Sequence, residues 1–242
     1  MLLAPSPFPM VAARYPRSRS SVATMVRRNP GLYAREMRDR WVVLDAKGVI
    51  YRHGYDVEEL LIPYVQRAGS SASPERVRAL YLLASVGAIS SSAFWEALGI
   101  ASDDRDADYC SRYELTDGFH DFVAAIGPCR LACLTNDVSE WSQLARTQLC
   151  VGANFDAWLV SGELRCRKPA PEIYRLAADR LGADGADVLF VDDRAINLEE
   201  GRRRGWQVLH FGRDGQVGER VETFSELARI VTSWLDRRAA SV

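Results

Sequence analysis

Three apolar runs that each end in polar residues constrain this chain more than any other feature. They are WVVLD at 41–45, RLACLTN at 130–136 and DVLFVDD at 187–193. Short apolar runs bounded by turn signals are typical of strands buried within a sheet. Ligands bind beyond the carboxyl ends of the strands in open α/β sheets, so the polar residues that end these runs are predicted to meet at one ligand-binding edge.

The chain between the first two runs has a helical pattern. Apolar residues recur at spacings of three and four over 57–65 and 77–84, and a third helix is expected over 92–98. Residues 103–108 are predicted to form an acidic loop. A helical insertion after the first strand predicts a cap, here 55–113, which would exclude water from the strand ends and contact the substrate.

Beyond the cap, helices and strands alternate, which is typical of a parallel α/β sheet. The predicted fold class is therefore α/β, with a Rossmann-like core of about five parallel strands (41–54 and 114–242) and an α-helical cap. The remaining expected elements are helices at 118–126, 139–149, 171–181, 195–204 and 224–237, strands at 157–160 and 206–211, and a turn at Ser161-Gly162.

Composition limits the classes of partner. A net charge of −1 gives no reason to expect a nucleic acid or a membrane surface, and no apolar stretch approaches the ~18 residues that a membrane span needs. Five cysteines without a CxxC pair favour reduced, mostly buried thiols in a cytoplasmic protein. The oligomeric state has no signature in the sequence.

The first forty residues differ from the rest of the chain. They hold eight arginines against two acidic residues, are rich in Pro and Ser, and show no sustained periodicity before Leu32. A transit peptide has this composition, and so does a disordered arm. Translation starting at Met37 is a third interpretation. We favour a dispensable, disordered basic extension over 1–40.

The polar residues together resemble the four motifs of the haloacid dehalogenase (HAD) superfamily of hydrolases with a helical cap after the first strand. The resemblance covers about 41–212, and its motifs occur in order along the chain. They are Asp45 in LDAKGV, Thr135 in LTN, Lys168 in RKPAPEIY, and Asp192 with Asp193 in FVDDRAIN. Each motif is weak alone, but four in sequence, three of them at strand ends, make a specific signal.

The resemblance implies covalent catalysis. Asp45 would attack phosphorus or, in dehalogenases, carbon, and form an ester that water then cleaves. Thr135 and Asn136 would bind the oxygens of a small phosphorylated substrate. Lys168 would contact the substrate and offset negative charge around the intermediate.

The resemblance also implies Mg²⁺, which prefers oxygen ligands. Asp45, the backbone carbonyl of Lys47 and Asp192 would bind it, with Asp193 or Asn197 contributing directly or through water. An alternative role for Asp193 is to cap the helix that follows it.

Lys47 departs from the family pattern. Phosphatases of the superfamily usually carry a second Asp there, which protonates the leaving group and later activates water. A missing general acid/base costs about 10²–10⁴ in rate, and an ammonium with a pKa of about 10.4 is a poor base.

Three outcomes are compatible with this lysine. Lys47 could protonate the leaving group, its ammonium could pair with the aspartate cluster and replace Mg²⁺, or the site could have lost turnover. Restoring Asp at this position is predicted to raise phosphatase activity if the rest of the apparatus is intact.

The sequence thus predicts a HAD-like hydrolase of the phosphatase type that acts on a small phosphorylated metabolite through Asp45. A catalytically silenced binding protein and a metal-independent dehalogenase-type hydrolase are the alternatives. Dehalogenases of the superfamily also lack the second Asp, but the Asp192-Asp193 pair and Asn197 favour a metal-binding site.

Overall fold

A parallel six-stranded sheet forms the centre of the molecule. The computed structural model describes residues 40–101, 103–126, 129–212 and 217–239, so the predicted basic extension lies outside the described residues, apart from residue 40. The strand order is β3-β2-β1-β4-β5-β6. The strands are β1 (Trp41–Leu44), β2 (Arg130–Thr135), β3 (Ala157–Val160), β4 (Val188–Asp192), β5 (Gln207–Phe211) and β6 (Glu219–Val221).

The register of the central strands brings the predicted motifs together. The last residue of β1, Leu44, pairs with Cys133 of β2 on one side and with Val191 of β4 on the other. The backbone N–H of Asp45 still donates to the Val191 carbonyl at 2.9 Å. The residues that follow β1, β2 and β4 therefore emerge at one edge of the sheet, as the three apolar runs predicted.

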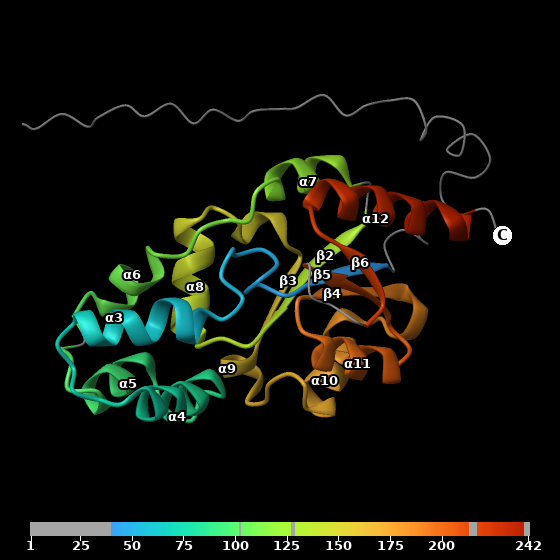
Figure 1. The fold of residues 1–242 in the computed structure, drawn as a ribbon. Coiled ribbons are helices and arrows are strands. Elements are labelled where there is room, and N and C mark those ends of the chain that lie inside the picture. The colour runs from blue at the N-terminus through green and yellow to red at the C-terminus, as the bar shows by residue number, and fades with distance from the viewer. Residues whose placement is uncertain (1–39, 102, 127–128, 213–216, 240–242) are drawn as a thin grey trace, which may run out of the picture.

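Side chains that alternate along β1 belong to two hydrophobic layers. Trp41 and Val43 pack with α10 (Pro171–Leu181) and α11 (Ala195–Arg203). Val42 and Leu44 belong to the other layer, which includes α7 (Phe119–Ala125), α8 (Ser139–Gln148) and α12 (Phe224–Ala239). Figure 1 shows these helices on opposite sides of the sheet. Burial on both faces explains why the strands are continuously apolar.

The insertion after β1 is helical, as predicted, and lies beside the sheet rather than over its faces (Figure 1). Two of its helices start at a serine cap: the Ser73 hydroxyl accepts from the Arg76 N–H, and the Ser90 hydroxyl accepts from the Ala93 N–H. The elements are the π-helical turn η1 (Val57–Leu61), α3 (Ile62–Arg67), α4 (Pro74–Ser85), α5 (Ser91–Ala97) and α6 (Arg105–Cys110).

Three local expectations were wrong. The segment expected as an acidic loop is largely α6, because Tyr109 and Cys110 anchor it in the core. The expected turn at Ser161-Gly162 is the start of the short helix α9 (Ser161–Leu164). The sixth strand, β6, was missed because a three-residue edge strand carries no apolar run. Short 3₁₀ turns, η2 (Gly152–Asn154) and η3 (Gly185–Asp187), complete the described elements.

No helix in the described part of the chain combines the length and the apolar character that crossing a membrane requires.

Candidate active site

Three carboxylates and one ammonium meet where β1 and β4 end. Asp45, Asp192 and Asp193 each present an oxygen, and these oxygens lie within 4.8 Å of one another. The Nζ of Lys168 lies 2.9 Å from Asp45 Oδ1 and 2.7 Å from Asp192 Oδ2. The structure thus brings together four residues that the sequence predicted from three separate motifs.

Asp192 is held by the start of α11. Its Oδ1 accepts from the Arg194 N–H at 2.8 Å, and the Asn197 side-chain amide donates to both of its oxygens at 2.9 and 3.0 Å. Asn197 therefore orients Asp192 by direct hydrogen bonds.

Asp193 faces two glycines of the loop after β1. A Cβ built on Gly48 would lie 2.2 Å from Asp193 Oδ2, and one built on Gly54 would lie 2.5 Å from it. Only glycine admits the carboxylate here, and Gly48 also has a φ of +82°. Asp193 does not cap α11, since that helix starts without a side-chain cap and Asp193 Oδ1 has no hydrogen-bond partner within the described ranges.

The end of β2 contributes two side chains with different roles. Thr135 is fully buried, and its Oγ1 lacks a hydrogen-bond partner in the part of the chain that the structure describes. Asn136 uses its amide to bind the Lys168 backbone, accepting from the N–H at 2.8 Å and donating to the carbonyl at 2.9 Å. Asn136 therefore positions Lys168, while Thr135 keeps a free hydroxyl.

Burial and crowding of charge shift the pKa values of this cluster. Burial raises the pKa of Asp45 well above its usual value, although Lys168 opposes that shift. Burial and then the charge of Asp192 raise the pKa of Asp193 to about 7. Burial alone would lower the pKa of Lys168, but Asp192 and Asp45 outweigh it and the pKa is raised. The lysine therefore stays charged, but a single ammonium does not suffice to hold all three carboxylates in their ionised form.

The residues present fit a Mg²⁺ ion. Three carboxylates converge, all the available ligand atoms are oxygens, and Asp193 Oδ1 is a buried acceptor without a donor among the residues described. A divalent cation would offset the negative charge that one ammonium leaves.

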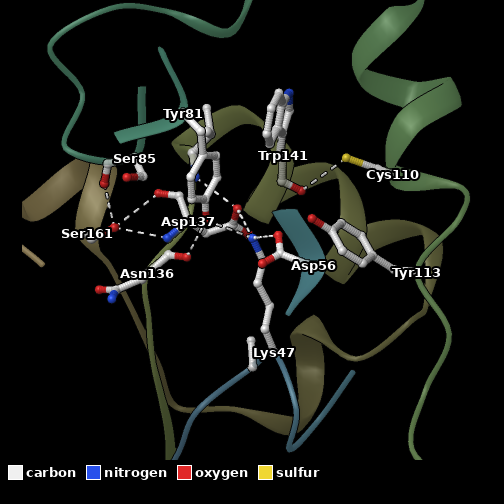
Figure 2. Close-up of polar contacts among 12 residues, drawn as sticks. Lys47, Asp56, Tyr81, Ser85, Cys110, Tyr113, Asn136, Asp137, Trp141 and Ser161 are labelled. Carbon is white, nitrogen blue, oxygen red and sulfur yellow. Dashed lines mark hydrogen bonds and ion pairs between the residues drawn. The ribbon is translucent and has the colours of Figure 1, made fainter. Parts of the chain in front are cut away.

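The Lys47 side chain points into a second group of charged residues, which includes Asp56 and Asp137 (Figure 2). Its Nζ lies 2.6 Å from Asp56 Oδ2 and 2.9 Å from Asp137 Oδ1, and it donates to the Tyr81 hydroxyl at 3.1 Å. The rings of Tyr81 and Tyr113 flank the ammonium, with centroids 5.2 and 5.7 Å away. Lys47 thus joins the core to Asp56 and Tyr81, two residues of the insertion.

This arrangement corrects one sequence-based alternative. The ammonium of Lys47 does not pair with Asp45, Asp192 or Asp193; Lys168 occupies that place. Burial would lower the pKa of Lys47, yet the charges of Asp137 and Asp56 raise it well above its usual value. A proton held so firmly makes Lys47 a poor acid and a poor base.

Sequence reasoning missed three members of this second group. Asp137 stands two residues before α8, where a helix cap would be the ordinary expectation, but α8 starts without a side-chain cap and Asp137 instead binds Lys47. Asp56 and Tyr81 carried no motif. The signal available in the sequence was Lys47 itself, which stands where the family usually has a carboxylate. A buried ammonium needs carboxylate partners, so partners for Lys47 could have been sought.

A cavity of about 260 Å³ opens beside Asp45, Asn136, Asp193 and Asn197. Lys47 lines it as well, and the insertion contributes the opposite wall, with Tyr55, Asp56, Val57, Glu58, Arg78, Tyr81 and Leu82. The predicted nucleophile therefore faces a space large enough for a small molecule.

Comparison with known proteins identifies the family. The model of haloacid dehalogenase-like hydrolases matches residues 40–205. This chain belongs to the haloacid dehalogenase-like hydrolases. The motif resemblance seen in the sequence is thereby confirmed at the level of the superfamily.

Named relatives of this HAD-like hydrolase include both dehalogenases and other HAD enzymes. The (S)-2-haloacid dehalogenase 4A of Burkholderia cepacia is 32% identical over 89 residues, 37% of this chain and 38% of that enzyme. The match thus spans less than two fifths of the relative's length.

Two solved structures show the same fold. The L-2-haloacid dehalogenase of Xanthobacter autotrophicus with covalently bound chloropropionic acid has a TM-score of 0.59 at 20% identity, covering 79% of this chain and 98% of its own. A HAD family enzyme of Bacteroides thetaiotaomicron, solved as a magnesium complex, has a TM-score of 0.63 at 20% identity. The match covers 78% of this chain and 98% of that enzyme's chain. At this identity the likeness concerns the fold alone.

Proposed function

We propose that this HAD-like hydrolase is a phosphatase that acts on a small phosphomonoester through Asp45. The meeting of Asp45, Asp192 and Asp193 within 4.8 Å supports this proposal most strongly. A phosphate dianion cannot approach this group unless positive charge offsets the repulsion. Mg²⁺ bound by these carboxylates, together with the Lys47 backbone carbonyl expected from the family motif, would supply that charge between nucleophile and substrate.

In the first step a carboxylate oxygen of Asp45 forms a bond to phosphorus while the bond from phosphorus to the substrate oxygen breaks. The alcohol leaves as an alkoxide or phenolate and takes a proton from water. Lys168 stabilises the negative charge from one side, and the free hydroxyl of Thr135 donates to a phosphoryl oxygen.

In the second step water attacks phosphorus, the Asp45–phosphate bond breaks, and inorganic phosphate leaves with the carboxylate regenerated. The residue that usually assists both steps is replaced by Lys47, whose ammonium is bound by Asp56 and Asp137. We therefore propose a slow phosphatase rather than one assisted by Lys47.

Phosphate release from a panel of phosphomonoesters tests the proposal. Wild type should release phosphate with Mg²⁺ and lose the activity in EDTA, while Asp45→Asn should be inactive. The Arg175→Met variant, which changes an exposed ion pair on α10, is a matched control and should behave as wild type. Mg²⁺-independent release, or release that survives Asp45→Asn, contradicts the mechanism, and no release at all favours a silenced binding protein.

Dehalogenation is a second candidate, because the 32% identical relative is a haloacid dehalogenase and Lys168 neutralises Asp45 without a metal. Asp45 would attack the carbon that bears the halogen, halide would leave, and water would cleave the ester. Chloride release from (S)-2-chloropropionate in EDTA, abolished by Asp45→Asn, would establish this reaction in place of the phosphatase.

A further inference from the structure

Two arginines in the wall of the active-site cavity form no ion pair with a carboxylate of the described residues. Arg167 and Arg194 both line the cavity, one beside Lys168 in sequence and the other beside Asp193. Within the described ranges no carboxylate forms an ion pair with either guanidinium; the ion pairs of the cavity involve Lys47, Lys168 and Arg78 instead.

The surroundings of each guanidinium hold it at the cavity. Arg167 is partly buried, donates from Nη1 to the Ser85 hydroxyl at 2.6 Å and lies 5.7 Å from the centroid of the Tyr81 ring. Arg194 is exposed and lies 5.8 Å from the centroid of the Tyr55 ring. A guanidinium has five N–H donors, so most of those on Arg167 remain available to a ligand.

Arg78 offers an internal comparison. It also lines the cavity, but its Nε and Nη2 each lie 2.8 Å from a Glu58 oxygen, and Nη1 lies 3.3 Å from Glu75. Its charge is already balanced. Arg167 and Arg194 therefore carry the positive charge in this wall that is not balanced by an ion pair.

Apolar surface adjoins the two arginines. Tyr55 is 64% exposed and Leu82 is 51% exposed, and both line the cavity. Large apolar side chains left this exposed at a concave site favour a ligand with an apolar part. A guanidinium fork matches a carboxylate or a phosphate, whose oxygens can accept two parallel hydrogen bonds.

We propose that the substrate is a phosphomonoester whose leaving group has an apolar ring or chain and a second anionic group, which Arg167 and Arg194 bind. This rests on the proposed phosphatase activity. The phosphoryl group would face Asp45, the apolar part would cover Tyr55 and Leu82, and the second anion, a carboxylate or a second phosphate, would meet the guanidinium groups.

Three substrates that share one ring test this inference: phenyl phosphate, 4-carboxyphenyl phosphate and 1,4-phenylene bisphosphate. Either 4-carboxyphenyl phosphate or 1,4-phenylene bisphosphate should react with a kcat/KM about tenfold or more above that of phenyl phosphate. A charge-assisted hydrogen bond to the second anionic group provides a gain of this size. Which of the two substrates is preferred shows whether the second anionic group is a carboxylate or a phosphate. Arg167→Met and Arg194→Met should reduce the preference, mainly through KM, while Arg175→Met, at an exposed ion pair that does not line the cavity, leaves the preference unchanged.

Phosphonates separate this inference from the proposed function, because they bind without being hydrolysed. Calorimetry with Mg²⁺ should show at least one of 4-phosphonobenzoate and 1,4-phenylenebisphosphonate binding about tenfold more tightly than phenylphosphonate, and Arg167→Met should remove the difference. Equal binding overturns the inference even if phosphate esters are hydrolysed. Preferential binding without hydrolysis of any ester supports the anion subsite and refutes the phosphatase.

Discussion

A single residue, Lys47, holds together two carboxylates that would otherwise repel each other. Its Nζ contacts Asp56 and Asp137 in a site where all three side chains are at most 8% exposed. Lys47→Met keeps the apolar stem but leaves both carboxylates without their cation, so unfolding free energy should fall by about 3–5 kcal/mol. Urea unfolding measures this loss. Arg78→Met, which breaks exposed pairs, is the control and should cost about 0–1 kcal/mol.

The same contacts change what is expected of Lys47→Asp. From the sequence, restoring the family's carboxylate should raise phosphatase activity. In the structure the new carboxylate would stand beside Asp56 and Asp137, so we now expect a less stable protein with no gain in phosphate release. Adding Asp137→Asn to Lys47→Asp should recover part of the stability in urea. A single variant that is both stable and more active would refute this account of the lysine.

Asp193 makes the stability of the metal-free protein depend on pH. Its pKa is raised from about 4 to about 7, first by burial and then by Asp192. Between those values the folded state binds more protons than the unfolded state, so stability present at low pH is lost as pH rises toward 7. Asp193→Asn should flatten this decline and gain up to about 4 kcal/mol at pH 8 in EDTA. The midpoints of urea unfolding, measured from pH 5 to 8, test this prediction. Parallel pH curves for wild type and Asp193→Asn would rule out Asp193 as the cause of the decline.

Among single residues, the sequence predicted those that directly follow the end of a strand. Asp45 and Asp192 meet because β1 and β4 are neighbours with aligned ends. Asp56 and Tyr81 were beyond reach, since their contacts with Lys47 depend on how the insertion docks on the core. No local pattern encodes that docking.

At the scale of elements, α6 shows how a charged segment becomes structural. Asp106 accepts from the indole N–H groups of Trp95 on α5 and Trp141 on α8, at 2.7 and 2.6 Å, and from the Ser91 hydroxyl at 2.5 Å. The sequence predicted a loop there because acidic residues outnumber apolar ones. Three donors from two other helices, α5 and α8, converge on this one carboxylate, and such long-range contacts cannot be inferred from spacing.

Asp106→Ala should therefore loosen the contact between α6, α5 and α8. Two indole donors would lose their acceptor, at about 1–3 kcal/mol each, so a loss of about 3 kcal/mol is expected. Asp106→Asn keeps a carbonyl acceptor and should lose less, and Asp103→Ala, at an exposed position, should be near neutral. Urea unfolding followed by tryptophan fluorescence gives the comparison, and equal stability of all three variants would contradict the role of Asp106.

At the scale of the whole molecule, the loop after β1 and the insertion together keep Lys47 and Tyr81 from donating a proton to the leaving group of the proposed phosphatase reaction. The Lys47 proton is held by Asp56 and Asp137, and the Tyr81 hydroxyl, whose pKa burial raises, donates to the Asn136 carbonyl at 3.0 Å. Substrates that leave as stable anions should therefore react fastest. Across a series of substituted phenyl phosphates, kcat/KM should rise steeply as the leaving-group pKa falls.

A comparison of aryl with alkyl phosphate esters measures how strongly the rate depends on the leaving-group pKa. General acid catalysis is worth about 10²–10⁴ in rate, so 4-nitrophenyl phosphate should exceed an alkyl phosphate of similar size by at least about 10² in kcat/KM. Binding differences are removed by normalising to the affinities of the matched phosphonates. A dependence close to zero would mean that a residue of the cavity does supply a proton, and a steep dependence in Tyr81→Phe would then identify Tyr81 as the source.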